Sequence, residues 1–307
     1  MNTNPSQFPL TLAIISLISW TFVLGGHAEA QLYVSDQNTG IIGKYDQVTG
    51  AAINASLVTG LNSPQGLALA GNSLFVANFF DNTVGKYDAT TGVAINANFI
   101  TGLSTPVGFA LSGNNLFVDN LSGSIGVYNA TTGAAINAAL VTGLNTPQGI
   151  ALAGNRLLVS TSGDFVVSEY DATTGALVNA SFIANAGGGT LAIAGNSVFV
   201  ADVNASTIRE FDLLTGAVIT ANFITGLSGP FGIAVFNNEL FETNLGGPGT
   251  GSVGKYDADT GATINAGFIT GLNQPIGIAV VPEPATWMAL CAGLGLLLGR
   301  RSRRPLS

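Results

Sequence analysis

The side chains that most enzymes use for covalent and acid-base chemistry are missing from the middle of this chain. Its single histidine is His27 and its single cysteine is Cys291, so residues 31–281 contain neither type. This composition excludes cysteine nucleophiles, histidine general bases, disulfides and thiolate or imidazole metal ligands from that segment. We therefore predict no catalytic residues, no cofactor and no metal site.

Short polar residues recur where a hydrophobic run such as "LFVA" ends, and they are the first candidates for a binding site. This polar ring consists of Asp36, Asn78, Asn120, Thr161, Asp202 and Asn244. Such residues can cap the turn that follows a strand. If the strands converge on an axis, the same residues can form a channel mouth that holds a cation or a hydroxyl-rich ligand. The sequence leaves both interpretations open.

The loops after these runs differ most between copies, as binding loops on a rigid scaffold do. One of them begins with Phe79 and Phe80. This aromatic pair is a candidate ligand contact, and the alternative is that both rings pack under their own loop.

Three lysines occupy one repeated position beside a tyrosine: Lys44, Lys86 and Lys255. We expect them on an outer strand, either solvated or paired with nearby acids. No base and acid are arranged around them as catalysis requires.

The chain that carries these residues is built from one repeat of about 42 residues. An aromatic residue followed by an acid or amide marks each copy, at Tyr45, Tyr87, Tyr128, Tyr170, Phe211 and Tyr256, at spacings of 42, 41, 42, 41 and 45 residues. Runs such as "LFVA" and "VAINANFI" are typical of strands, whereas "DATTG" and "SGN" are typical of turns. Each copy predicts four strands and no helix.

Six copies of four strands are typical of a β-propeller, and a linear β-solenoid is the alternative. The first copy lacks its "P-x-G" strand, and the chain has a spare one at Pro275–Val280. Joining the two ends completes a sixth blade and closes the ring, which leaves no end repeat to be capped. We therefore predict an all-β, six-bladed propeller over residues 31–280, with the small residues Gly66 and Gly149 near its axis.

One copy departs from this pattern. It reads "NAGGGTLAIAGN", with Gly188 and Thr190 where the other copies have proline and glycine. We expect this blade to pack more loosely than the others.

The repeat, with "P-x-G-I-A", "LFVAN", "K-Y-D" and "T-G", resembles the NHL and YVTN type of propeller, and more distantly the propellers related to regucalcin. The resemblance covers residues 31–280 and implies the fold, whereas function varies among such propellers. Regucalcin-like enzymes hold a divalent metal at the channel mouth, and here Asp36, Asp119, Asp202 and Glu242 could approach that region. A metal-dependent hydrolase or lactonase is therefore the alternative function. "DVNAS", from Asp202, resembles an EF-hand opening but lacks its later glycine and glutamate.

Residues 1–30 resemble a secretory signal peptide, with an apolar stretch at residues 10–24 and small residues before a cleavage point after Ala30. Because no basic residue precedes the apolar stretch, an uncleaved anchor is the alternative. The propeller that follows carries five basic and fifteen acidic residues. Nucleic acid is a poor partner for so acidic a surface.

Residues 281–307 resemble the PEP-CTERM sorting signal. They contain Pro282, Glu283 and Pro284, then a short apolar stretch, then Arg300, Arg301, Arg303 and Arg304. The resemblance implies insertion in the inner membrane, processing by an exosortase-type enzyme and release to the cell surface or an extracellular matrix. An ordinary C-terminal membrane anchor is the alternative, although the fifteen-residue stretch 285–299 is short for a ~30 Å hydrocarbon core.

These observations favour an exported, membrane-anchored and then surface-associated propeller that acts as a non-catalytic binding or structural module. Extracellular polysaccharide or another surface protein is the expected partner.

Overall fold

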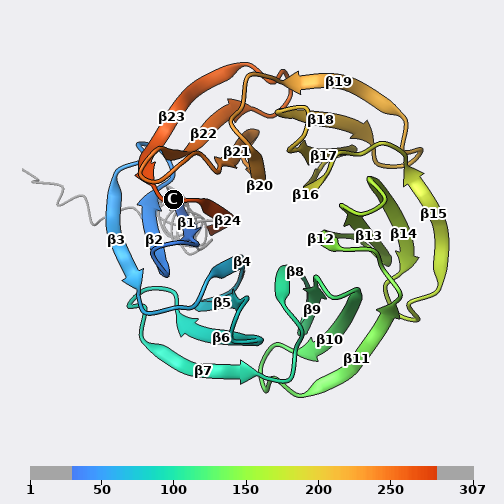
Figure 1. The fold of residues 1–307 in the computed structure, drawn as a ribbon, viewed down its shortest axis with the longest axis horizontal. Coiled ribbons are helices and arrows are strands. Elements are labelled where there is room, and N and C mark those ends of the chain that lie inside the picture. The colour runs from blue at the N-terminus through green and yellow to red at the C-terminus, as the bar shows by residue number, and fades with distance from the viewer. Residues whose placement is uncertain (1–29, 282–307) are drawn as a thin grey trace, which may run out of the picture.

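The strands of the protein form six four-stranded antiparallel sheets, arranged as blades around a central axis (Figure 1). The structure is a computed structural model and describes residues 30–281. It confirms the predicted all-β, six-bladed propeller. The predicted signal peptide, apart from Ala30, and the sorting residues from Pro282 onward lie outside the described residues.

Each blade is numbered here by its order along the chain, so that blade 1 holds β1, blade 2 begins at β4 and blade 6 begins at β20. The innermost strands are β24 (Pro275–Val281), β4 (Pro64–Ala70), β8 (Pro106–Ser112), β12 (Pro147–Ala153), β16 (Gly188–Ala194) and β20 (Pro230–Phe236). The second strands are β1 (Gln31–Asp36), β5 (Ser73–Asn78), β9 (Asn115–Asn120), β13 (Arg156–Thr161), β17 (Ser197–Asp202) and β21 (Glu239–Asn244).

The outer half of each blade has the same order. The third strands are β2 (Ile41–Asp46), β6 (Thr83–Asp88), β10 (Ser124–Asn129), β14 (Val166–Asp171), β18 (Thr207–Asp212) and β22 (Gly251–Asp257). The outermost strands are β3 (Ala52–Val58), β7 (Ala94–Ile100), β11 (Ala135–Thr142), β15 (Leu177–Ile183), β19 (Val218–Ile224) and β23 (Thr263–Leu272).

The ring closes as the sequence predicts, because β24 pairs with β1 in blade 1. Leu32 lies opposite Val280, and Val34 lies opposite Ile278. The closing strand extends one residue further than expected, to Val281, which pairs with Gln31. Strand pairing therefore joins the first and the last strand of the described residues.

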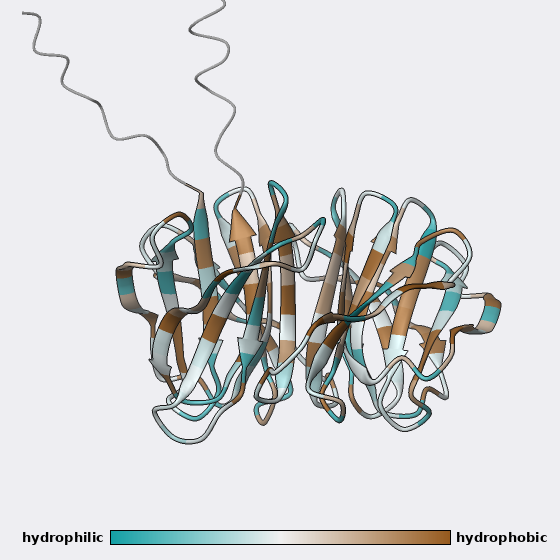
Figure 2. Cartoon of the chain, turned by 90° about the horizontal axis from the view of Figure 1, so that it is seen from above, coloured by the Kyte–Doolittle hydropathy of each residue, from teal (hydrophilic) through white to brown (hydrophobic). Residues whose placement is uncertain are grey.

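Closure also fixes two distinct faces of the ring, seen edge-on in Figure 2. Asp36 pairs with Pro275 at one end of blade 1, and Gln31 pairs with Val281 at the other end. We call the end with Asp36 and Pro275 the ring face, because the polar ring lies there. The described chain ends at Val281 on the opposite face.

The hydrophobic core lies between neighbouring blades. Each of its six clusters combines side chains from two adjacent sheets; for example, Phe75 and Phe99 of blade 2 pack with Leu116 and Tyr128 of blade 3. The Phe75 and Phe99 ring centroids are 5.5 Å apart. Residues 30–281 include no helix of a length and hydrophobicity that could cross a membrane.

Glycines allow the innermost strands to approach one another at the axis. A Cβ atom on Gly149 would lie 2.8 Å from the Cα atom of Thr190 in the next blade, and a Cβ on Gly66 would overlap the carbonyl oxygen of Val107. The predicted place of these glycines near the axis is confirmed.

The three lysines were expected to be solvated or ion-paired on an outer strand, and this expectation is wrong in part. They lie on third strands, and Lys44 and Lys255 are buried. Lys44 Nζ donates to Ala89 O (3.4 Å), Lys86 Nζ to Ala130 O (3.0 Å) and Lys255 Nζ to Gln47 O (3.2 Å). Each ammonium thus joins its blade to the next one, over aromatic rings of its own blade. Lys255 does pair with an acid, Glu239, at 2.9 Å.

Candidate functional site

The structure places the polar ring on one face, where the second strands end beside the starts of the innermost strands. Asn78 pairs with Pro64, Asn120 with Pro106 and Asn244 with Pro230. All six ring residues are nevertheless buried, with at most 8% of their surface exposed. A ligand on this face would meet the loops before it met these side chains.

The oxygens of the polar ring are mostly engaged by backbone amides of the ring-face loops. Asn244 Oδ1 accepts from Ser228 N (2.8 Å), and Asp202 Oδ1 accepts from Ala205 N (2.9 Å). Asp36 accepts from Thr39 N (3.3 Å) with Oδ1 and from Asn273 N (2.7 Å) with Oδ2. These contacts support turn capping, since the loops would otherwise leave buried amide groups unpaired.

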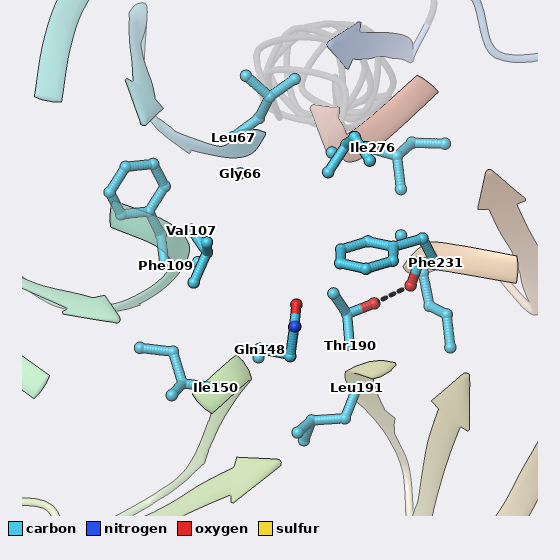
Figure 3. A pocket seen from close by; sticks show the side chains of 16 residues that line it. Gly66, Leu67, Val107, Phe109, Gln148, Ile150, Thr190, Leu191, Phe231 and Ile276 are labelled. Atoms are coloured by element: carbon cyan, nitrogen blue, oxygen red, sulfur yellow. Dashed lines mark hydrogen bonds between the residues drawn. The ribbon is translucent and has the colours of Figure 1, made fainter. Parts of the chain in front are cut away.

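The central channel is narrow, and polar and apolar groups contribute about equally to its wall. It offers about 90 Å³ to water-sized molecules, and Val107, Phe231 and Ile276 contribute to its wall (Figure 3). The Thr190 hydroxyl donates to the backbone carbonyl of Phe231 across the wall. Such a channel is too small for a ligand of the size that typical binding pockets hold.

The carboxylates proposed for a metal-dependent enzyme do not gather at the channel mouth. Asp119 lies behind Gly108 of the adjoining innermost strand, fully buried, and neither carboxylate oxygen has a hydrogen-bond partner. Burial raises the pKa of Asp119 well above its ordinary value. Among residues 30–281, no three histidine, cysteine, aspartate or glutamate side chains lie close enough to hold a metal ion together.

Glu242 is also buried, three blades away from Asp119. Its Oε1 accepts from Asn244 Nδ2 and from the Tyr256 hydroxyl (3.4 Å), while Oε2 has no hydrogen-bond partner. Burial raises the pKa of Glu242 to about 8. Neither buried acid is accessible to a substrate on the surface.

The aromatic pair lies on the ring face in the loop after β5. The Phe79 and Phe80 rings meet edge to face with centroids 5.1 Å apart. Phe79 is half-buried, and Phe80 is 62% exposed. Phe79 thus packs partly under its loop, while Phe80 is available for contact.

Sequence reasoning missed one feature of the ring face, a hollow of about 440 Å³ beside blades 4 and 5. It is lined by Phe165, Asn185, Gly187, Asp202, Asn204 and Ala205. Only Asp202 was among the predicted site residues. The atypical copy "NAGGGT" lies at this place in the sequence. Its residues predicted loose packing, but they did not predict a hollow in the surface.

Comparison with known proteins shows the fold and nothing finer. No protein-family model matches the chain, and no curated protein matches it. A chain in the crystal structure of a nidogen/laminin complex superposes with a TM-score of 0.66 and 14% identity, over 83% of this chain and 100% of that chain. The computationally designed Ika8 protein gives a TM-score of 0.49 and 18% identity, over 80% and 73% of the two chains.

The fold by itself does not select a function. In all, 1423 chains of solved structures match it, and propellers serve many unrelated roles. The NHL, YVTN and PEP-CTERM resemblances therefore stay predictions from sequence motifs.

Proposed function

We propose that this protein is an exported propeller that binds matrix or surface components without catalysing a reaction. Its partners are an exosortase-type processing enzyme during export and an extracellular polysaccharide or surface protein afterwards. The observation that carries the proposal is the division of the ring into two faces. The binding-type loops and exposed aromatic residues lie on the ring face, while the described chain ends on the other.

This division suits a tethered binding domain. Val281 is directly followed by the predicted sorting residues Pro282, Glu283 and Pro284. A membrane anchor beyond Val281 would hold the propeller by the face opposite the ring face. The ring face, with Phe80 and the hollow, would then point away from the membrane.

The available chemistry also favours binding over catalysis. The propeller has no histidine or cysteine, and its two acids with the most strongly raised pKa values, Asp119 and Glu242, are enclosed in the fold. The ring face offers amide groups, hydroxyls, backbone and aromatic rings. These groups recognise ligands through hydrogen bonds and stacking rather than by covalent attack.

Cell fractionation tests the proposal directly. We expect the wild-type protein in the surface or matrix fraction, shortened at its C-terminus. Replacing Pro282, Glu283 and Pro284 together by alanine should trap an uncut form in the inner membrane, because the sorting motif is lost while the apolar and basic parts remain. Immunoblots of each fraction measure both location and size.

A control variant makes this experiment selective. The substitution Asp259→Asn changes an exposed acid of the propeller and serves as a control that should leave sorting unchanged. Normal processing of the triple variant, or wild-type protein that never leaves the membrane fraction, would contradict the proposal.

A further inference from the structure

The hollow between blades 4 and 5 is lined in part by a shortened loop. Four residues lie between Ile183 and Gly188, whereas five lie between Ile100 and Pro106 at the same place between blades 2 and 3. Ala186 takes the position of a leucine, since its N–H donates to Phe165 O (2.7 Å) as Leu103 N–H donates to Asn82 O (3.3 Å). Ala186 itself is buried in the core between blades 4 and 5, while its neighbours Asn185 and Gly187 line the hollow.

The residue that faces this space is conformationally unusual. Phe165 has φ of 54° and lies directly before β14. The matching residues before β2, β6, β10 and β18 are Gly40, Asn82, Gly123 and Ser206, all with positive φ. Glycine and asparagine tolerate this conformation, whereas a bulky residue is strained in it. Such a conformation is imposed by the surrounding structure, and strained residues of this kind often cluster at ligand contacts.

The backbone around Phe165 brings polar and aromatic groups into one shallow site. A Cβ atom on Gly188 would lie 3.3 Å from Cδ1 of Phe165, and a Cβ on Gly187 would overlap Asp202. The glycine run therefore packs closely against both side chains, and Gly187 belongs to the lining of the hollow. Phe165 remains 43% exposed.

The charges at the hollow are already balanced within the protein. Arg209 Nη1 lies 3.9 Å from Asp202 Oδ2 and also donates to the backbone carbonyl of Asn185. Asp202 Oδ1 accepts from Ala205 N. In contrast, the exposed side-chain amides of Asn185 and Asn204 make no hydrogen bond within the described part of the chain.

We infer that this hollow is a binding site for a neutral saccharide, with Phe165 as its stacking platform. The C–H face of a pyranose ring packs on an aromatic ring, and its hydroxyls pair with amide donors and acceptors such as those of Asn185 and Asn204. A cationic ligand would find the carboxylate in the lining, Asp202, already paired with Arg209, and an anionic ligand would face a strongly acidic propeller. This inference rests on the proposed binding function and names its ligand class and location.

A glycan array followed by calorimetry tests the site. The probes are immobilised neutral and anionic oligosaccharides, and the strongest one is then titrated in solution against the purified protein. We expect a neutral oligosaccharide to bind and Phe165→Asn to weaken its affinity at least about tenfold, as loss of a central aromatic contact does. Because asparagine suits a positive φ, the melting temperature of this variant should be unchanged or higher.

Matched variants separate this site from the rest of the ring face. Phe80→Asn removes the other exposed aromatic side chain of residues 30–281 and should leave the affinity unchanged, while Asn204→Ala should weaken it without affecting folding. If Phe80→Asn loses affinity for the saccharide while Phe165→Asn keeps it, the saccharide does not bind in this hollow. The inference is then wrong, whereas the proposed binding function still stands. Binding of anionic glycans alone, or of none by a protein that is still retained in the matrix, likewise overturns only this inference.

Discussion

At the scale of single residues, two acids replace uncharged side chains inside an otherwise repetitive core. Glu242 stands where the other five blades have Val34, Val76, Val118, Val159 and Val200. Asp119 stands where two other blades have a hydroxyl that bridges neighbouring strands: Ser35 Oγ donates to Gln65 O (2.6 Å), and Thr243 Oγ1 donates to Ile276 O (3.0 Å). A buried carboxyl group without full hydrogen bonding lowers stability.

Glu242 should therefore make the stability of the protein depend on pH. Its pKa rises from 4.5 to about 8 on folding. Between these values the folded state holds a proton that the unfolded state releases, so stability falls as pH rises. At about 1.4 kcal/mol per pKa unit, the effect amounts to several kcal/mol. We expect Glu242→Val to raise the melting temperature more at pH 8 than at pH 5.

Thermal melts at the two pH values measure this difference. Asp259→Asn, which changes an exposed acid in the same blade, is the control and should shift both melts little. Asp119 carries a raised pKa as well, so some dependence of the same sign should remain. Equal effects of Glu242→Val at both pH values would show that Glu242 does not titrate in this way.

At the scale of elements, the "DATTG" turn connects the third and the outermost strand of blade 2 and also contacts blade 1. Asp88 Oδ1 accepts from Thr90 N (3.0 Å), Thr91 N (2.8 Å) and Thr91 Oγ1 (2.9 Å). These hydrogen bonds hold the pKa of Asp88 below its ordinary value. Gly92 then turns the chain with φ of 75°, and a Cβ there would overlap the carbonyl oxygen of Leu57 in blade 1.

This contact predicts different costs for two similar substitutions. Gly102 also has a positive φ, of 73°, but a Cβ on it would meet nothing within 4 Å. Gly102→Ala should lower the free energy of unfolding by about 1 kcal/mol, the cost of the conformation alone. Gly92→Ala should cost about 1–3 kcal/mol more, because blade 1 must also shift. Urea unfolding of both variants measures the two costs, and equal costs would argue against the close contact between blades.

At the scale of the whole molecule, closure makes the six blades depend on one another. Gly277 N donates to Ser35 Oγ (2.7 Å), and the same oxygen donates to Gln65 O in blade 2. Blade 1 is thus completed by residues separated by 242 positions. Without β24, the inner edge of β1 would lose its hydrogen-bond partners and the neighbouring cores would be exposed.

Removal of the closing strand should therefore affect the entire ring. We expect protein lacking residues 275–307 to lose its single cooperative unfolding transition and to become sensitive to protease. Protein lacking only residues 282–307 is the control and should melt as the wild type does. Calorimetry with limited proteolysis checks both, and equal melting of the two forms would mean that five complete blades are stable without closure.

The sequence by itself determined the number of blades, their strands and the closure, because every blade repeats the same turn residues and hydrophobic spacing. It also located the polar ring, since each short polar residue follows a strand. Only the tertiary structure decided that the ring residues are buried, that the lysines join adjacent blades and that Phe165 borders a hollow. These features depend on contacts between blades. A repeat pattern specifies the strands and turns within one blade, whereas the space between two blades depends on the side chains that both blades contribute.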